Sequence, residues 1–192
     1  MVALIDHPED LLQQCQRIFS PGGRLSTALV DFTSREAQVV LALAIAKAIT
    51  QYSALAAEAG TGTGKTFAYL VPCLLSKKKT IISTATKTLQ DQLFSKDLPL
   101  LTRALGLSVK MQNLKGRSNY ICRHRVLMYM EEGRFSDVHA MQDLIQIHER
   151  LPRLETGDRA ELTEITEDSP AWTYATSTND NCLGSECKHY KE

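Results

Sequence analysis

The chain has 192 residues, of which 43% are hydrophobic and 23% are charged, which is typical of one folded domain, or one and a fraction, and excludes a fibre or a disordered tail. Its 22 Lys and Arg residues balance its 22 Asp and Glu residues, which argues against a polybasic binder but still allows a local basic groove. The longest apolar run, residues 39–49, is too short to span a bilayer, and the first ten residues lack the pattern of a secretory signal. We therefore expect a cytoplasmic protein with no membrane partner.

Helical and strand-like segments alternate along the first 115 residues. The spacing of apolar residues predicts helices over residues 10–19, 33–51, 67–75 and 86–94, and the second of these opens with a capping-box pattern at residues 33–36. Short apolar or β-branched runs predict buried strands over residues 52–57, 80–83 and 108–114. This alternation favours an α/β fold with a parallel sheet and crossover helices.

The remainder of the chain has a different pattern. Helices are predicted over residues 120–130 and 137–150, and a polar, acidic segment over residues 151–170 is typical of a loop-rich surface. The simplest interpretation is a mainly helical subdomain inserted after the third strand. We therefore divide the chain into residues 1–115 and residues 116–192.

A glycine-rich segment precedes the helix predicted over residues 67–75. It matches the Walker A pattern in all but its first position, and its residues are Ala59, Gly60, Thr61, Gly62, Thr63, Gly64, Lys65 and Thr66. Glycines let backbone N–H groups converge on phosphates, and the following helix presents its N-terminus to the same anion. Lys65 would then neutralise the β- and γ-phosphates of ATP, and Thr66 would ligate Mg²⁺. The alternative is a glycine-rich turn that happens to precede a lysine.

Three segments in this order resemble motifs of the DinG/XPD-like group of superfamily-two DNA helicases. Residues 58–66 resemble motif I, and residues 83–93 resemble motif Ia, which lies against the nucleic-acid backbone. Phe32, Arg35 and Gln38 resemble the Q-motif, in which the glutamine reads the adenine edge with its donor and acceptor. Taken singly, these three residues would be ordinary helix surface.

This resemblance implies a RecA-like P-loop NTPase fold, incomplete in this chain, with a mainly helical iron–sulfur insertion. It also implies ATP-dependent DNA unwinding with 5′→3′ movement along one strand, coupled to DNA repair. By the same resemblance, Arg35 and Gln38 belong to the nucleotide site. The residues implied for contacts with the DNA backbone are Thr84, Thr86, Lys87, Lys115 and Arg117.

The five cysteines do not form an evident disulfide framework, and Cys15 and Cys73 fit buried thiols of helices. Cys122 lies in a segment that resembles the one supplying the first iron–sulfur ligand in the same helicases, and Cys182 and Cys187 follow. The resemblance implies a 4Fe-4S cluster on these three thiolates. The family pattern needs a fourth cysteine about half a dozen residues later, and this sequence has none. Zinc, with His189 as a further ligand, and simple unliganded thiols are the alternatives.

Basic residues surround Cys122, either as a solvated charged face or as a groove for single-stranded or forked DNA. They are Lys110, Lys115, Arg117, Arg123, His124 and Arg125.

The sequence contains no DEAH-type Walker B motif, no Ser-Ala-Thr motif and no second motor domain. We expect the chain to be the N-terminal piece of a longer helicase that binds ATP weakly, does not unwind duplexes by itself, and exposes apolar surface where further strands pack. The alternatives are a non-catalytic nucleotide- or DNA-binding fragment and a small P-loop kinase with incidental cysteines.

Overall fold

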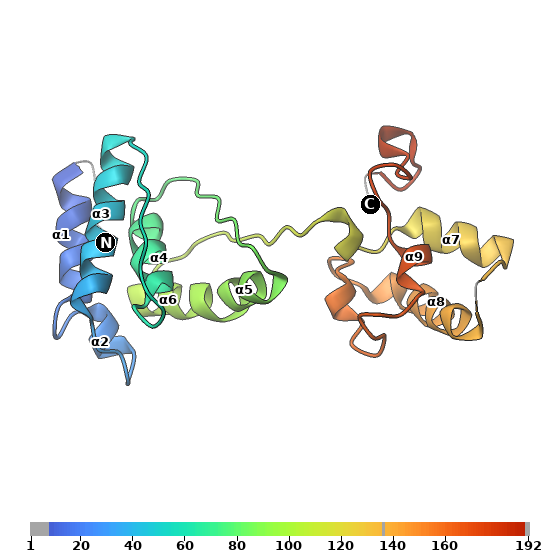
Figure 1. Ribbon diagram of the computed structural model, residues 1–192, viewed down its shortest axis with the longest axis horizontal. Helices are drawn as coiled ribbons and strands as arrows, with labels where there is room; N and C mark the ends of the chain where they lie inside the picture. Colours follow the sequence, from blue (N-terminus) through green and yellow to red (C-terminus); the bar gives the residue numbers. More distant parts are fainter. Residues whose placement is uncertain (1–7, 136, 191–192) are drawn as a thin grey trace. The chain divides into compact units, whose positions relative to one another are not determined.

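The computed structural model describes residues 8–135 and 137–190 of the chain (Figure 1). The chain separates into two units, Met1–Asn113 and Leu114–Glu192, which we call unit 1 and unit 2. Each unit has its own cluster of buried hydrophobic side chains.

The described part of unit 1 is built from helices. They are α1 (Pro8–Phe19), α2 (Arg24–Ala28), α3 (Glu36–Gln51), α4 (Lys65–Leu75), α5 (Lys87–Gln92) and α6 (Leu98–Leu105). Helix α3 packs against both α1 and α4, and the three run side by side in Figure 1. Ala42 and Ala46 lie one above the other on α3 and are fully buried, so this face has no bulky side chain to hold the neighbouring helices away. The helices predicted over residues 10–19 and 67–75 are confirmed.

Two helix ends differ from the sequence predictions. The predicted capping box is wrong, because Arg35 is the extended residue before α3 and no side-chain capping bond forms there. Glu36 is thus the first residue of the helix and not its third, so its carboxylate cannot fold back as a capping box requires. Further along, α5 continues through a π-helical turn (Leu93–Asp97) into α6, which was not predicted. Pro99, a residue type that usually ends a helix, lies just after the π-helical turn, at the point where the helix passes into α6.

The predicted parallel sheet is not confirmed: no residue within 8–135 or 137–190 lies in a strand. The segments expected as strands are extended or irregular and expose apolar side chains, among them Leu55 (45% exposed) and Ile81 (88% exposed). Both residues line a cleft of about 590 Å³ whose other walls come from α3 and α4. A strand is defined by the ladder that it forms with a neighbour, and within the described residues these segments do not form one. The exposed apolar surface expected from the sequence is therefore present.

Unit 2 is built around two helices, α7 (Arg123–Glu132) and α8 (Val138–Arg150), and the short helix α9 (Trp172–Ala175). Asp137 begins α8 by accepting a hydrogen bond from the backbone N–H of Ala140, so the helix predicted over residues 137–150 is confirmed. Three-residue 3₁₀ turns lie at Arg117–Asn119, Leu151–Arg153, Arg159–Glu161 and Gly184–Glu186. Isolated β-bridges join Tyr120 to Asp158 and Ile121 to Thr176.

The core of unit 2 lies where α7, α8 and α9 meet. Val126, Leu144 and Ile147 are fully buried there, and Trp172 is 6% exposed. The indole N–H of Trp172 donates to the backbone oxygen of Thr166, which satisfies the one polar atom of a buried ring. The segment of residues 151–170, predicted to be rich in loops, has few regular elements and contributes Leu151, Leu162 and Ile165 to this core. None of the helices among the described residues is both long and apolar enough to cross a membrane.

Candidate nucleotide-binding site

The glycine-rich loop of residues 59–64 leads directly into α4. Gly62 and Gly64 both have φ of +78°, a left-handed conformation that glycine adopts without the steric cost of a β-carbon. Gly64 is the residue before α4 and makes no side-chain capping bond. The first N–H groups of α4 therefore lack a side-chain cap, which is the arrangement that suits an anion at a helix N-terminus.

The side chain of Lys65 folds back over this loop. Its ammonium group donates hydrogen bonds to the backbone oxygens of Ala59 (2.7 Å) and Gly60 (2.9 Å). The hydroxyl of Thr63 donates to the same Gly60 oxygen at 2.9 Å and tightens the bend. These carbonyls are neutral acceptors, so a phosphate oxygen would be a stronger partner for the ammonium group. The charge of Lys65 is thus held beside the bend formed by the loop.

The start of α3 lies against the loop. The side-chain amide of Gln38 donates to the backbone oxygen of Gly64 at 3.0 Å, and Gln38 is only 4% exposed. A β-carbon on Gly62 would lie 3.9 Å from a guanidinium nitrogen of Arg35, so this residue also borders the loop. Two residues of the predicted Q-motif are therefore brought to the Walker A loop.

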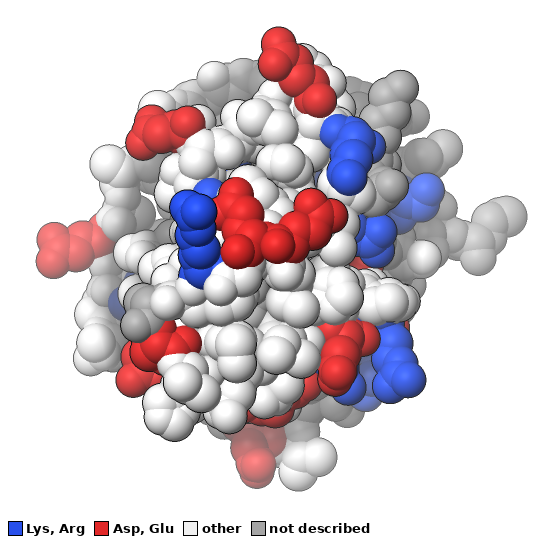
Figure 2. Space-filling model, turned by 90° about the vertical axis from the view of Figure 1, so that its right-hand side faces the viewer, with Lys and Arg blue, Asp and Glu red and all other residues white. Residues whose placement is uncertain are grey.

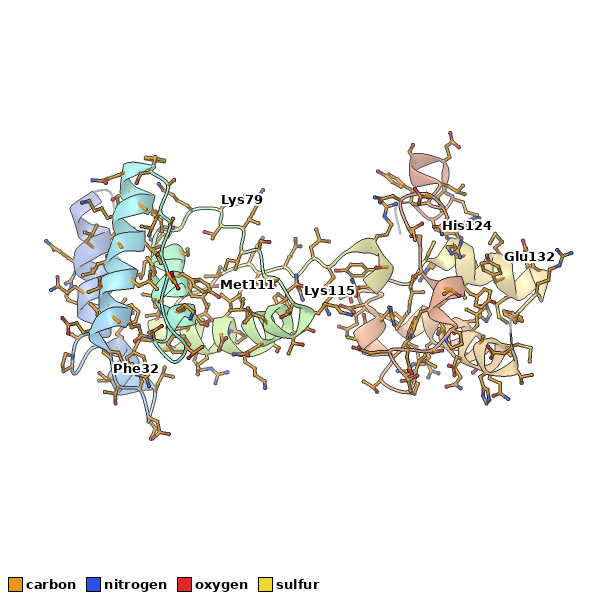
Figure 3. All side chains as sticks on the ribbon, in the orientation of Figure 1. Phe32, Lys79, Met111, Lys115, His124 and Glu132 are labelled. Atoms are coloured by element: carbon orange, nitrogen blue, oxygen red, sulfur yellow. The ribbon has the colours of Figure 1, made fainter. Side chains whose placement is uncertain are left out.

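Phe32, the third residue of the predicted Q-motif, precedes α3 and is labelled in Figure 3. Its ring stacks on that of Phe67 in α4, with centroids 6.1 Å apart and planes at 21°. It also contacts the ring of Phe19 at 6.4 Å. Phe32 thereby packs the segment before α3 against the first turn of α4.

The residue after Lys65 is already engaged within α4. Burial raises the pKa of Tyr69, and an interaction with the Thr66 side chain offsets part of that effect. Sequence analysis did not single out Tyr69, although its position three residues after Thr66 on a helix would place the two side chains on one face.

The residues predicted to contact the DNA backbone in residues 83–93 have local structural roles. The Thr86 hydroxyl caps α5 by accepting from the backbone N–H of Leu89 at 3.2 Å. The Thr84 hydroxyl donates to the backbone oxygen of Thr86 at 3.2 Å. Lys87 is exposed at the first position of α5. A threonine directly before a helical pattern is the signal from which the cap could have been predicted.

The three cysteines of the predicted cluster are partly exposed thiols of unit 2, and none is in a disulfide. Cys122 directly precedes α7, and its backbone N–H donates to Ala175 at 2.7 Å. Cys182 accepts a hydrogen bond at its sulfur from the N–H of Gly184 (3.4 Å), and Cys187 ends the turn that follows. Among the described residues, no three His, Cys, Asp or Glu side chains gather closely enough to hold a metal ion. The described structure thus does not gather these cysteines into a group of metal ligands.

The basic residues around Cys122 differ in exposure and in the groups that they contact. Lys115, labelled in Figure 3, makes an ion pair with Asp158 at 2.8 Å, and its side chain is 6% exposed. Arg125 donates to the backbone oxygen of Thr173 at 2.6 Å and stacks over the ring of Tyr129. Arg117 is exposed. Cations and carboxylates are interspersed on the face shown in Figure 2. The partner of Lys115 lies 43 positions further along the chain, and nothing in the sequence pattern indicates it.

Comparisons with known proteins agree with the helicase resemblance. Residues 40–154, more than half of the chain, match the model of the DEAD/DEAH box helicase family. The chain is 46% identical over 174 residues to ATP-dependent DNA helicase YoaA of Escherichia coli, covering 91% of this chain and 27% of that protein. It is 45% identical over 183 residues to ATP-dependent DNA helicase YoaA of Haemophilus influenzae, covering 95% and 29%. It is also 30% identical over 171 residues to 3′-5′ exonuclease DinG of Bacillus subtilis, covering 86% and 18%. The chain thus spans less than a third of the length of these curated relatives.

Proposed function

This chain belongs to the DEAD/DEAH box helicase family, and on that premise we propose that it binds Mg²⁺–ATP in the loop of residues 59–64 as part of an ATP-dependent DNA helicase. The family implies a RecA-like fold. The two YoaA relatives are named as ATP-dependent DNA helicases, which supports the same activity for the protein of which this chain is a part.

The observation that carries the proposal is the position of Lys65. Its ammonium group lies against the carbonyls of Ala59 and Gly60, at one end of a loop with two left-handed glycines and at the first residue of α4. A glycine-rich turn without a ligand has no need of a cation held against its carbonyls, whereas a triphosphate needs both the cation and the uncapped helix N-terminus. We therefore assign the phosphate tail of ATP to this loop.

The remaining residues take supporting roles in the proposal. Lys65 would exchange its carbonyl partners for the β- and γ-phosphates, and the loop glycines would admit the backbone close to the phosphates. The Thr66 hydroxyl would turn from Tyr69 to ligate Mg²⁺, which supplies charge neutralisation on the phosphate oxygens. Gln38 and Arg35, which border the loop, would lie on the adenine side.

We extend the proposal to the organisation of the whole helicase. Residues 1–115 would form the N-terminal part of its ATP-binding domain, and residues 116–192 an inserted subdomain. The segments of residues 52–57, 80–83 and 108–114 would then be strands of a parallel sheet completed by polypeptide outside this chain; their exposed apolar side chains support this. DNA in single-stranded or forked form would be the substrate of a cytoplasmic repair enzyme, with Thr84, Thr86, Lys87 and Arg117 near the DNA backbone.

The experiment measures saturable binding of a fluorescent ATP analogue with Mg²⁺ to the unmodified chain and to Lys65→Ala. Loss of a charge-assisted contact predicts at least about tenfold weaker binding for Lys65→Ala. Lys47→Ala is the matched control, since Lys47 is an exposed lysine of α3. Equal affinities for all three proteins, or no saturable binding by folded unmodified chain, would contradict the proposal.

A non-catalytic nucleotide- or DNA-binding module is the second candidate. The absence of a DEAH sequence from these 192 residues favours it for the chain taken alone. ATP hydrolysis in the presence of single-stranded DNA separates the two. Turnover that rises with DNA and is lost in Lys65→Ala supports a motor, and binding without turnover supports the module.

We also propose, separately, that Cys122, Cys182 and Cys187 hold a 4Fe-4S cluster after a rearrangement of unit 2. Their shared unit, partial exposure and freedom from disulfides support this. Iron and acid-labile sulfide are measured after anaerobic purification. Iron and sulfide in stoichiometric amounts would support the cluster, and metal without sulfide would indicate zinc. The absence of both metal and sulfide would contradict the proposal.

A further inference from the structure

The two left-handed glycines of the phosphate-binding loop border the same turn at the start of α3. Gly62 faces Arg35, and a β-carbon on Gly64 would collide with the side-chain amide of Gln38. Arg35 directly precedes α3, and Gln38 is the third residue of that helix. The start of α3, with the residue that precedes it, therefore lies against both left-handed glycines of the loop.

The hydrogen bond from Gln38 acts on a single peptide group of the loop. The Gly64 oxygen accepts from Gln38 at 3.0 Å and from the backbone N–H of Ala68 at 3.2 Å, so both of its lone pairs have donors. One donor belongs to α4 and the other to α3. The orientation of this carbonyl is thus determined from two helices.

That orientation also determines the direction of the Lys65 N–H. The peptide bond between Gly64 and Lys65 is planar, so its C=O and its N–H point in opposite directions. With the carbonyl directed at Gln38 and Ala68, the N–H of Lys65 is directed away from both. This N–H belongs to the first residue of α4 and has no partner within the helix, which makes it a donor for an anion.

We infer that Gln38 is a positioning residue for the triphosphate: through the Gly64 carbonyl it orients the backbone amide that meets the phosphate, whatever base the nucleotide carries. The inference rests on the proposed function of the loop. It differs from a role at the adenine edge because it predicts that Gln38 affects a ligand without a base.

The probe is inorganic tripolyphosphate with Mg²⁺, compared with Mg²⁺–ATP by calorimetry on the unmodified chain and on Gln38→Met. Methionine fills a similar volume but cannot donate a hydrogen bond. We expect Gln38→Met to lower the affinity for both ligands by about tenfold, the size expected for one hydrogen bond at a buried acceptor. Gln51→Met, at the exposed end of α3, is the matched control and should leave both affinities unchanged. A loss confined to ATP would overturn the inference.

Amide hydrogen exchange in the ligand-free protein provides a second measurement that does not depend on binding. In Gln38→Met we expect several-fold faster exchange of the Ala68 amide, which donates to the Gly64 oxygen, with the amides of α6 unchanged as an internal reference. Unchanged exchange of the Ala68 amide would overturn the inference. If the unmodified chain binds neither ligand, the proposed function fails, and the exchange result alone decides whether Gln38 orients the loop.

Discussion

The ion pair between Lys115 and Asp158 leads to a quantitative prediction for Lys115→Met. The two side chains are 2.8 Å apart and are 6% and 17% exposed, so the pair is largely shielded from water. The pair joins the start of unit 2 to the turn at Arg159–Glu161, beside the bridge between Tyr120 and Asp158. Replacing the lysine removes the ammonium group paired with Asp158, and Arg159 is then the cation that still interacts with this carboxylate.

The expected loss of stability follows from how much of the carboxylate stays satisfied. Removing one partner of a fully buried ion pair costs about 3–5 kcal/mol. Asp158 keeps a hydrogen bond from the N–H of Ala160 at 3.0 Å, and its partial exposure admits water. We therefore expect Lys115→Met to lower the free energy of unfolding of unit 2 by about 2 kcal/mol.

Urea unfolding followed by the fluorescence of Trp172 measures this loss, because this single tryptophan lies in the core of unit 2. Lys188→Met is the control, since Lys188 is an exposed lysine of the same unit. Asp158→Asn should lower the free energy of unfolding by less when it is added to Lys115→Met than when it is made in the unmodified chain. A loss below about 0.5 kcal/mol, which is typical of an exposed pair, would refute the reasoning and leave Lys115 available to DNA.

Three further predictions concern the cores and one helix cap. Burial, with a smaller contribution from Cys73, raises the pKa of Cys15 to about 12 from 9.0. Between these values the folded chain keeps a proton that the unfolded chain releases. The contribution of Cys15 to the free energy of unfolding is therefore fully present below pH 9 and is lost as pH rises toward 12. Cys15→Ala should reduce that fall in urea unfolding followed by circular dichroism, and identical pH slopes would contradict the prediction. Thr86→Ala should speed hydrogen exchange of the Leu89 amide, because losing a helix cap lowers stability by about 1 kcal/mol. The control Thr88→Ala should leave this exchange rate unchanged, and equal rates in the two variants would count against the cap. Leu144→Ala, at a fully buried position, should destabilise unit 2 by about 3 kcal/mol in the Trp172 assay, and a loss under about 1 kcal/mol would show that the core is not packed as described.

Local chemistry allowed the nucleotide site to be predicted from its residues. The spacing of Gly62, Gly64 and Lys65 before an amphipathic run indicates a bend, a cation and a helix N-terminus, and the structure has α4 beginning at Lys65 after two left-handed glycines. These features depend on neighbours within a few residues along the chain. The same is true of α1, α4 and α8, whose apolar periodicity is sufficient to predict them.

The strands could not be established in this way. Apolar runs such as residues 80–83 have strand-like composition, but a strand exists only when another segment supplies hydrogen bonds along its length. Among the described residues these segments have no ladder, and Ile81 is largely exposed. Composition therefore indicated only a tendency of these segments to form strands. Whether a strand forms depends on pairing with another segment.

The sequence by itself determined the family, the loop to which we assign the phosphate tail of ATP, and the helices around that loop, because each depends on short-range spacing. Only the tertiary structure decided that Gln38 lies against Gly64, that Lys115 is neutralised by Asp158, and that Cys122, Cys182 and Cys187 do not converge among the described residues. The first two are contacts between residues 26 and 43 positions apart. Their formation depends on how whole helices and turns pack, and no local pattern of residue types encodes that packing.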